Sequence, residues 1–240
     1  MLPMDGPATG TGEETIEVAD AALAVGDPTE AARLYERASE GREENAQVLL
    51  GLGRSYMQLG QLGRAENALL RAAQLAPRDP AVPIELGRLA LQRRQPEQAM
   101  AQFDRALTLD RRSLGAITGK ALSLDYLSRH SEAQAVYRMG LDIYPTNFAL
   151  LNNQALSMVL SGRIGQGIVL LEELVTDPQR GNTARTNMAI AYALEGRERD
   201  ARAMLTGTMP EGEIAADLAY YRKIRTDFMA GRPVGHLVFR

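Results

Sequence analysis

Cysteine is absent from this sequence, and aromatic residues make up only 5% of it. Without cysteine the chain can form neither a disulfide nor a thiolate metal site, so its composition does not indicate a redox compartment. β-Branched residues are sparse as well, whereas alanine, leucine, arginine and glutamate dominate, and this balance favours helix over sheet. Because 45% of the residues are hydrophobic, there is enough apolar material for a continuous core. The composition therefore predicts an all-α protein.

Long apolar runs and blocks of like charge are also missing. No stretch approaches the ~18 consecutive apolar residues that a membrane-spanning helix needs. The 27 basic and 30 acidic residues are mixed along the chain and leave a net charge of -3, so no nucleic-acid partner is expected. Residues 1–12 lack the basic segment followed by an apolar segment that marks an export signal. We therefore expect a lipid anchor only if an N-terminal signal and a cysteine were removed.

A small residue recurs every 34 positions along most of the chain. The six members of this column are Ala31, Ala65, Ala99, Ala133, Gly167 and Ala201. Four residues after each comes a large apolar side chain, in the order Tyr35, Leu69, Phe103, Tyr137, Leu171 and Leu205. A period of 34 residues is that of tetratricopeptide repeats, each of which is a hairpin of two helices. With the small residue at position 20 of a unit, the predicted repeats are 12–45, 46–79, 80–113, 114–147, 148–181 and 182–215.

Two further columns support this register. Position 8 is always glycine or alanine, which lets the two helices of a hairpin approach closely: Ala19, Gly53, Gly87, Ala121, Ala155 and Ala189. Position 15 should end the first helix in left-handed backbone geometry, and most of its members are glycine: Gly26, Gly60, Arg94, Ser128, Gly162 and Gly196. The pattern predicts a right-handed superhelical solenoid of about six repeats over residues 12–215.

The segments outside the repeats have their own signals. Residues 1–11, rich in glycine, proline and threonine, are predicted to be disordered. The last hairpin needs a cover for its apolar face, so residues 216–231 are predicted to form a C-terminal capping helix. Apolar residues recur around this segment at helical spacing: Ile214, Leu218, Tyr221, Ile224 and Phe228. Gly231, Arg232 and Pro233 should stop the helix, and residues 232–240 are expected to be a flexible tail.

No arrangement of residues in the sequence is typical of an enzyme. His130 and His236 lie far apart, without a local carboxylate or histidine spacing that would suggest a metal site, and we expect both on the solvated surface. The glycine-rich runs 60–63 and 162–167 follow no strand and fall between helices, so they are interpreted as turns rather than phosphate loops. We expect no catalytic residue, no metal and no cofactor.

The first helices of stacked hairpins form the inner wall of a superhelix, and this extended groove suits a partner helix or peptide. In tetratricopeptide proteins, positions 2, 5, 9, 12 and 13 of each unit commonly face that groove. Carried over by resemblance, they predict a partner-binding groove of Leu50, Arg54, Met57, Ile84, Arg88, Leu91, Leu122, Asp125, Tyr126, Asn152, Leu156, Val159, Leu160, Thr186, Ile190 and Leu194. Packing between adjacent hairpins is the alternative role for any one of them. The second half of the wall is apolar, so a partner with aliphatic anchors is expected.

Some polar residues of this wall suggest more specific roles. Arg54 and Arg88 occupy equivalent positions and could bind an acidic residue of the partner. Asn153 and Asn187 share position 6 and could either hold a partner's backbone or bridge neighbouring helices. Some eukaryotic adaptors of this class capture a C-terminal carboxylate with a clamp of lysine and asparagine. Leu50 and Arg54 stand where the first such lysine and asparagine would be, so that role is not expected.

Several motifs in the last two repeats and the cap are more specific than the 34-residue pattern. They are Asn-Asn-Gln-Ala-Leu at 152–156, Leu-Ser-Gly-Arg at 160–163, Thr-Ala-Arg-Thr-Asn-Met-Ala at 183–189, Ala-Leu-Glu-Gly-Arg at 193–197 and Ala-Tyr-Tyr-Arg at 219–222. Together they resemble the C-terminal half of the TadD proteins of the bacterial Tad (tight adherence, Flp) pilus assembly system. The wider resemblance covers roughly residues 46–230.

Members of that family resemble pilotins, which are exported, lipid-anchored repeat proteins at the inner face of the outer membrane. They are thought to help the secretin channel assemble. The resemblance therefore implies a non-enzymatic scaffold in the periplasm, associated with the outer membrane, whose partner is the pilus secretin or another component of the Tad machinery. A general cytoplasmic tetratricopeptide adaptor or regulatory protein is the alternative.

Overall fold

The computed structural model describes residues 12–40 and 45–239, and every regular element in these ranges is a helix. In chain order these helices are α1 (Gly12–Ala24), α2 (Pro28–Ser39), α3 (Ala46–Gln58), α4 (Leu62–Leu75), α5 (Ala81–Gln92), α6 (Pro96–Leu109), α7 (Leu114–Tyr126), α8 (His130–Ile143), α9 (Phe148–Leu160), α10 (Ile164–Leu174), α11 (Gly181–Leu194), α12 (Glu198–Leu205), α13 (Glu211–Met229) and α14 (Gly235–Val238). The predicted fold class, an all-α solenoid of helix pairs, is confirmed. The segment 1–11, predicted to be disordered, lies outside the described residues.

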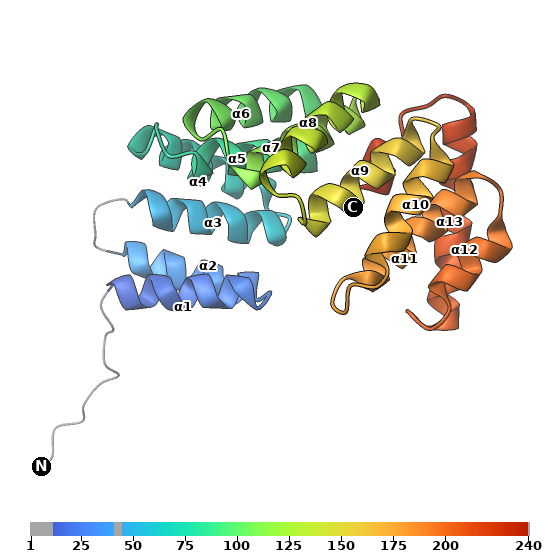
Figure 1. The fold of residues 1–240 in the computed structure, drawn as a ribbon. Helices are drawn as coiled ribbons and strands as arrows, with labels where there is room; N and C mark the ends of the chain where they lie inside the picture. The colour runs from blue at the N-terminus through green and yellow to red at the C-terminus, as the bar shows by residue number, and fades with distance from the viewer. Residues whose placement is uncertain (1–11, 41–44, 240) are drawn as a thin grey trace, which may run out of the picture.

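The helices from α1 to α12 form successive antiparallel pairs that stack in chain order (Figure 1). Each helix packs most closely against its hairpin partner and against the next hairpin along the chain. The first helices α3, α5, α7, α9 and α11 also contact one another in sequence, so they form a continuous wall along one side of the stack.

The turns within the hairpins adopt the left-handed geometry predicted for position 15. Its six members all have positive φ, from 58° at Arg94 and Ser128 to 85° at Gly26 and Gly162. The backbone N–H of the residue after each of them donates to a carbonyl five residues back, as Gln61 does to Tyr56. The turn therefore forms even where the residue is not glycine, because the carbonyls at the end of the preceding helix obtain donors.

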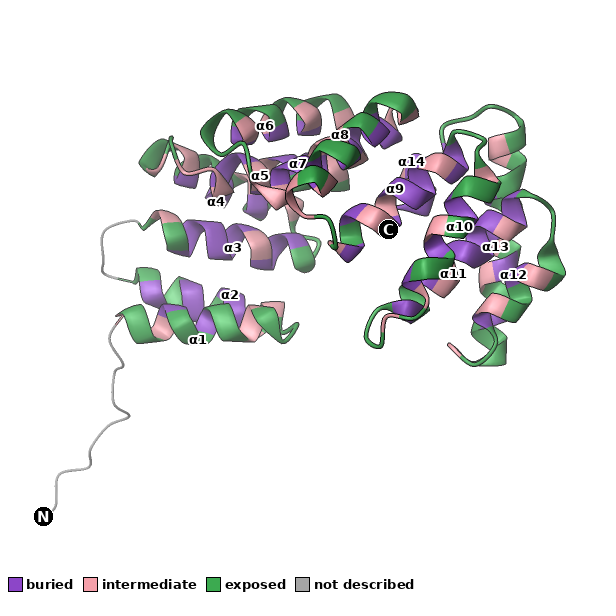
Figure 2. Cartoon of the chain, viewed as in Figure 1, coloured by how far each residue is buried: buried purple, intermediate pink, exposed green. Residues whose placement is uncertain are grey.

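Large side chains of one hairpin fill space left by glycines of the next. Tyr35 and Phe103 are fully buried, and their rings lie against Gly51 and Gly119. A Cβ atom at either glycine would lie only 2.2 Å from the Cζ atom of the ring. Figure 2 shows the buried residues along the faces where the helices meet and the exposed residues on their outer faces. The repeats are therefore locked by shape as well as by burial of apolar area.

The cap begins earlier than residue 216, because α13 starts at Glu211, immediately after Pro210. It contacts α11 and α12 and buries Ile214, Leu218, Tyr221 and Ile224. These four residues come from the apolar spacing identified in the sequence. They supply the cover that the last hairpin needs.

The expectation of a flexible tail over residues 232–240 is wrong for the part that the structure describes. After α13 the chain turns back, and its end lies near α9 in the middle of the molecule (Figure 1). Val234, Val238 and Phe239 are buried, and α14 packs against α7. The tail is ordered because its apolar side chains are buried against the apolar surface of other helices. The composition of the tail alone could not predict this long-range contact.

Candidate protein-binding groove

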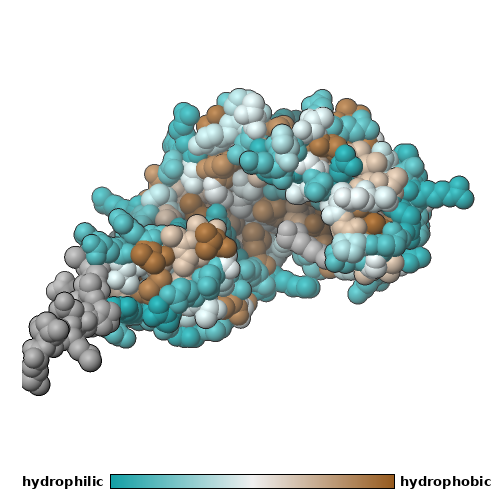
Figure 3. Space-filling view, turned by 90° about the horizontal axis from the view of Figure 1, so that it is seen from below, coloured by the Kyte–Doolittle hydropathy of each residue, from teal (hydrophilic) through white to brown (hydrophobic). Residues whose placement is uncertain are grey.

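A hollow lies along the wall of first helices in the C-terminal half. One cavity of about 300 Å³ is lined from α7, α9 and α11 by Leu122, Tyr126, Asn152, Asn153, Leu156, Thr183 and Asn187, with Val238 and Phe239 of the tail. A second of about 270 Å³ is lined by Thr183, Thr186, Asn187, Ile190, Asp217, Tyr220, Tyr221, Leu237 and Val238. Figure 3 shows a face that is hollowed in the middle, with hydrophobic surface inside the hollow and hydrophilic surface around it.

The two cavities share Thr183, Asn187 and Val238 and so belong to one surface, which we call the groove. The structure brings together six of the residues predicted to line it, namely Leu122, Tyr126, Asn152, Leu156, Thr186 and Ile190. Its walls combine apolar side chains with hydroxyls and amides. Such a surface can bury aliphatic anchors of a peptide while its polar groups bond to the peptide's backbone.

One hydrogen bond between the neighbouring asparagines joins two helices. Asn187 Nδ2 donates a hydrogen bond of 2.7 Å to Asn152 Oδ1, which connects α11 to α9 across the groove floor. Asn152 Nδ2 donates in turn to Asn153 Oδ1 at 3.3 Å. Of the two roles considered for Asn187, the bridge between helices is therefore the one present, whereas Asn153 remains partly exposed on the cavity wall.

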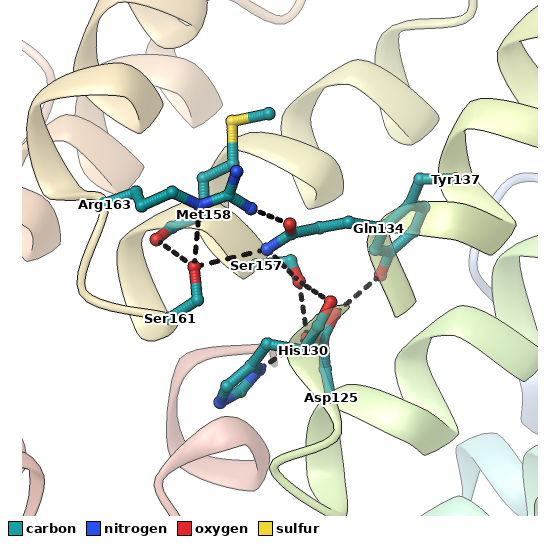
Figure 4. A network of polar contacts seen from close by, with 8 residues as sticks. All are labelled: Asp125, His130, Gln134, Tyr137, Ser157, Met158, Ser161 and Arg163. Carbon is teal, nitrogen blue, oxygen red and sulfur yellow. Dashed lines mark hydrogen bonds and ion pairs between the residues drawn. The ribbon is translucent and has the colours of Figure 1, made fainter. Parts of the chain in front are cut away.

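Asp125 does not face the groove, contrary to the prediction. Its side chain is fully buried at the junction of α7, α8 and α9 (Figure 4). Asp125 Oδ1 accepts a hydrogen bond of 2.6 Å from Ser157 Oγ and lies 2.8 Å from His130 Nδ1, and Oδ2 accepts one of 3.1 Å from Tyr137. Burial raises the pKa of the Asp125 carboxyl, and the bonds from His130, Ser157 and Tyr137 partly oppose that rise.

His130 is likewise not a solvated surface residue, because its side chain is only 15% exposed and is paired with Asp125. The network continues through Gln134, whose Nε2 lies 3.4 Å from Ser157 Oγ and whose Oε1 accepts from Arg163. In a catalytic triad the histidine stands between serine and aspartate. Here Ser157 and His130 both bind the same carboxylate, so the arrangement is not a triad. It is a buried hydrogen-bond network that connects repeats four and five.

Arg54 and Arg88 are also engaged within the chain. Arg54 Nε and Arg88 Nη1 lie 2.8 and 2.9 Å from Glu85 Oε1, and the Glu85 side chain is only 2% exposed. The acidic residue that these arginines were expected to find on a partner is therefore supplied by Glu85 of the same chain. Glu85 stands at position 6, where repeats two, four, five and six have glycine or asparagine and repeat one also has a glutamate, Glu17, so the sequence offered only a weak signal for this buried carboxylate.

The remaining predicted groove residues divide by burial. Ile84 and Leu91 of α5 are partly exposed. The following pack inside the stack rather than on an open wall: Leu50, Met57, Val159, Leu160 and Leu194. Sequence reasoning missed Thr183, Tyr220 and the tail residues; the only signal for the tail was the apolar cluster 237–239 after a helix stop.

No group of three or more His, Asp or Glu side chains in the described ranges could hold a metal ion. Separately, none of the helices that the structure describes is long and apolar enough to cross a bilayer. The hydroxyl of Ser157 and the imidazole of His130 do meet at the Asp125 carboxylate, but their hydrogen bonds connect α7, α8 and α9.

Stacked helical hairpins with a groove along their first helices define a helical-repeat scaffold that binds other proteins. Two family models, both described as tetratricopeptide repeat, match residues 22–82 and 84–148 and together cover just over half of the chain. The chain belongs to the tetratricopeptide repeat family.

Solved structures with this fold include a tetratricopeptide repeat protein from Parabacteroides merdae, with a TM-score of 0.74 and 17% identity over 90% of this chain and 86% of that one. The type IV pilus biogenesis factor PilW has a TM-score of 0.74 and 18% identity, over 88% of this chain and 100% of its own. At these identities the likeness shows the fold alone. In sequence, the chain is 32% identical to the uncharacterized protein y4yS of Sinorhizobium fredii over 83 residues, which are 35% of this chain and 46% of that relative.

Proposed function

We propose that this protein is a pilotin-like assembly factor for the secretin, or another component, of a Tad (Flp) pilus, and that it binds a helix or extended segment of its partner in the groove. The groove carries this proposal, because it combines apolar walls with hydroxyl and amide groups on three successive first helices. The resemblance of the last two repeats to TadD proteins supports the choice of partner. The fold shared with PilW, itself a pilus biogenesis factor, agrees with it.

The same resemblance supports a place in the periplasm, associated with the outer membrane, with a lipid anchor only if an N-terminal signal and a cysteine were removed. Fractionation of cells that express the protein from its native gene tests this part. Recovery with outer-membrane markers is the expected result. Recovery in the cytosol would instead favour a general cytoplasmic adaptor or regulator.

A capture experiment tests the partner and the groove together. Tagged wild-type protein should retain the secretin from cell extracts, and Leu122→Glu should lower the amount retained at least tenfold, because a carboxylate would replace an anchor contact of about 1.4 kcal/mol or more. Leu122 lies on the cavity wall and is partly exposed, so the variant should keep its helical circular dichroism.

Val169→Glu is the matched control, since Val169 is 59% exposed on α10, which is a second helix and lies off the groove wall. This variant should retain the secretin like wild type. Normal secretin assembly and localisation in a strain that lacks the gene would refute the assignment to the pilus. Equal capture by a folded Leu122→Glu variant would refute the placement in the groove.

A further inference from the structure

A segment of the same chain lies across the groove, where it covers part of the first-helix wall and leaves the two cavities beside it. Tyr126 of α7 donates a hydrogen bond of 2.8 Å from its hydroxyl to the carbonyl oxygen of Phe239, and Tyr220 of α13 donates one of 3.2 Å to that of Leu237. Val238 lines both cavities and is 5% exposed. Residues 234–239, which we call the tail segment, therefore cross the groove between the first helices and the cap.

The tail segment fits closely at its start. An added Cβ atom at Gly235 would lie 2.5 Å from the carbonyl oxygen of Asp125 and 3.1 Å from Cα of Tyr126. Both are backbone atoms at the end of α7, which cannot yield as a flexible side chain would. The one-turn helix α14 therefore touches α7 backbone to backbone, and only glycine permits that approach.

The contacts of the tail segment indicate which chemistry the groove accommodates. Its two named hydrogen bonds go to main-chain carbonyls, so they would serve a segment of any sequence. Selectivity comes instead from the apolar walls around Val238 and Phe239, which include Leu122, Leu156 and Ile190. The suitable ligand is a short protein segment with an aliphatic residue followed by an aromatic one, in a single helical turn.

We propose that the groove is a receptor for a partner segment with this chemistry and that the tail segment is the internal occupant which the partner displaces. This inference rests on the groove being the partner site. A tethered occupant competes at an effective concentration in the millimolar range for a short linker. Since the tail segment follows α13 after only a short turn, it lowers the apparent affinity of any partner segment until it leaves.

A labelled peptide with the sequence of residues 232–240 tests the proposal without any pilus component, so its failure is separable from failure of the capture experiment. Gly235→Ala in the full chain should unseat the tail segment, and fluorescence anisotropy should show at least tenfold tighter peptide binding than for wild type. Gly212→Ala is the matched control, because a Cβ atom at Gly212 on α13 would meet nothing within 4 Å. That variant should bind the peptide as weakly as wild type.

Phe239→Asp provides a second way to unseat the tail segment if Gly235→Ala does not fold, and it should have the same effect. Adding Leu122→Glu to either variant should abolish the gain. Peptide binding that is equal in wild type and both tail variants overturns the proposal, as does a gain that survives Leu122→Glu. A wild-type dimer in sedimentation that becomes a monomer in Gly235→Ala also overturns it, since the tail segment would then bind a second copy.

Discussion

At the scale of single residues, Asp125 is a carboxylate whose burial costs free energy. Its carboxylate is removed from water between three helices, a position that disfavours the charged form and raises its pKa. Bonds from Ser157, Tyr137 and His130 offset that cost. If the carboxylate is deleted, a different cost arises, because the hydroxyls of Ser157 and Tyr137 lose their acceptor while they stay buried.

Asp125→Ala should therefore lower the free energy of unfolding by about 3 kcal/mol, measured by urea denaturation. Asp104→Ala is the control, because Asp104 pairs with Lys120 at 2.6 Å on the surface with its side chain 48% exposed. Loss of such an exposed pair should cost less than about 1 kcal/mol. Similar losses from the two substitutions would contradict the role assigned to the Asp125 network.

We expect the seating of the tail segment to depend on pH through His236. Burial against α7 and the nearby charge of Arg94 lower its pKa below 6.5, and Asp227 partly opposes this shift. The docked tail segment therefore binds a proton less readily than the released one, and acid favours release. The aromatic ring of Tyr126 lies edge-on to His236 at 6.5 Å.

As pH falls from 7.5 to 5.5, binding of the 232–240 peptide should weaken for Gly235→Ala but change little for wild-type protein, because the peptide carries the same histidine and acid loosens the peptide and the tail segment alike. His236→Gln in the wild-type chain should remove most of this difference. A pH response that is unchanged by His236→Gln would show that another group is responsible. Anisotropy titrations at each pH provide the measurement.

At the scale of elements, each hairpin depends on a turn with positive φ, which glycine adopts with less strain than other residues. Gly60 has φ of 70°, and a Cβ atom added there would meet no other atom within 4 Å, so its constraint is backbone geometry alone. Gly63, in the first turn of α4, has the same open space around it but is helical. Glycine therefore has two different effects at these neighbouring positions: it permits positive φ at Gly60, and it weakens the helix at Gly63.

Gly60→Ala should destabilise the protein by roughly 1 kcal/mol, because alanine disfavours the left-handed region. Gly63→Ala should stabilise it by roughly 0.5–1 kcal/mol, since alanine loses less conformational entropy than glycine on entering a helix. Thermal or urea unfolding of the two variants checks the opposite signs. A loss of stability in both would show that contacts, and not φ, decide these positions.

At the scale of the whole molecule, hairpins contact mainly their neighbours, so the stability of each hairpin depends on the interfaces with the adjacent ones. The final hairpin is completed by α13, on which Ile224 is fully buried and Met229 is 67% exposed. Damage to the cap should therefore spread from the C-terminal end and fade toward α1. The groove lies at that same end.

Ile224→Asp should reduce hydrogen-exchange protection in α11 and α12 while α3 and α4 keep most of theirs. Met229→Asp, at the exposed end of the same helix, should leave protection unchanged. Uniform loss of protection along the whole chain in Ile224→Asp would indicate a single cooperative unit instead of a stack of coupled repeats.

The sequence by itself determined the helices, their pairing, the left-handed turns and which face of the stack forms a wall. These follow from spacings of a few residues and from a repeat whose neighbours in space are neighbours in sequence. Tertiary structure alone decided the roles of Asp125 and Glu85, which depend on contacts across repeats, and the fate of the tail. Tyr126 and Phe239 are 113 positions apart, and no periodic pattern links residues that meet only because the chain folds back into its own groove.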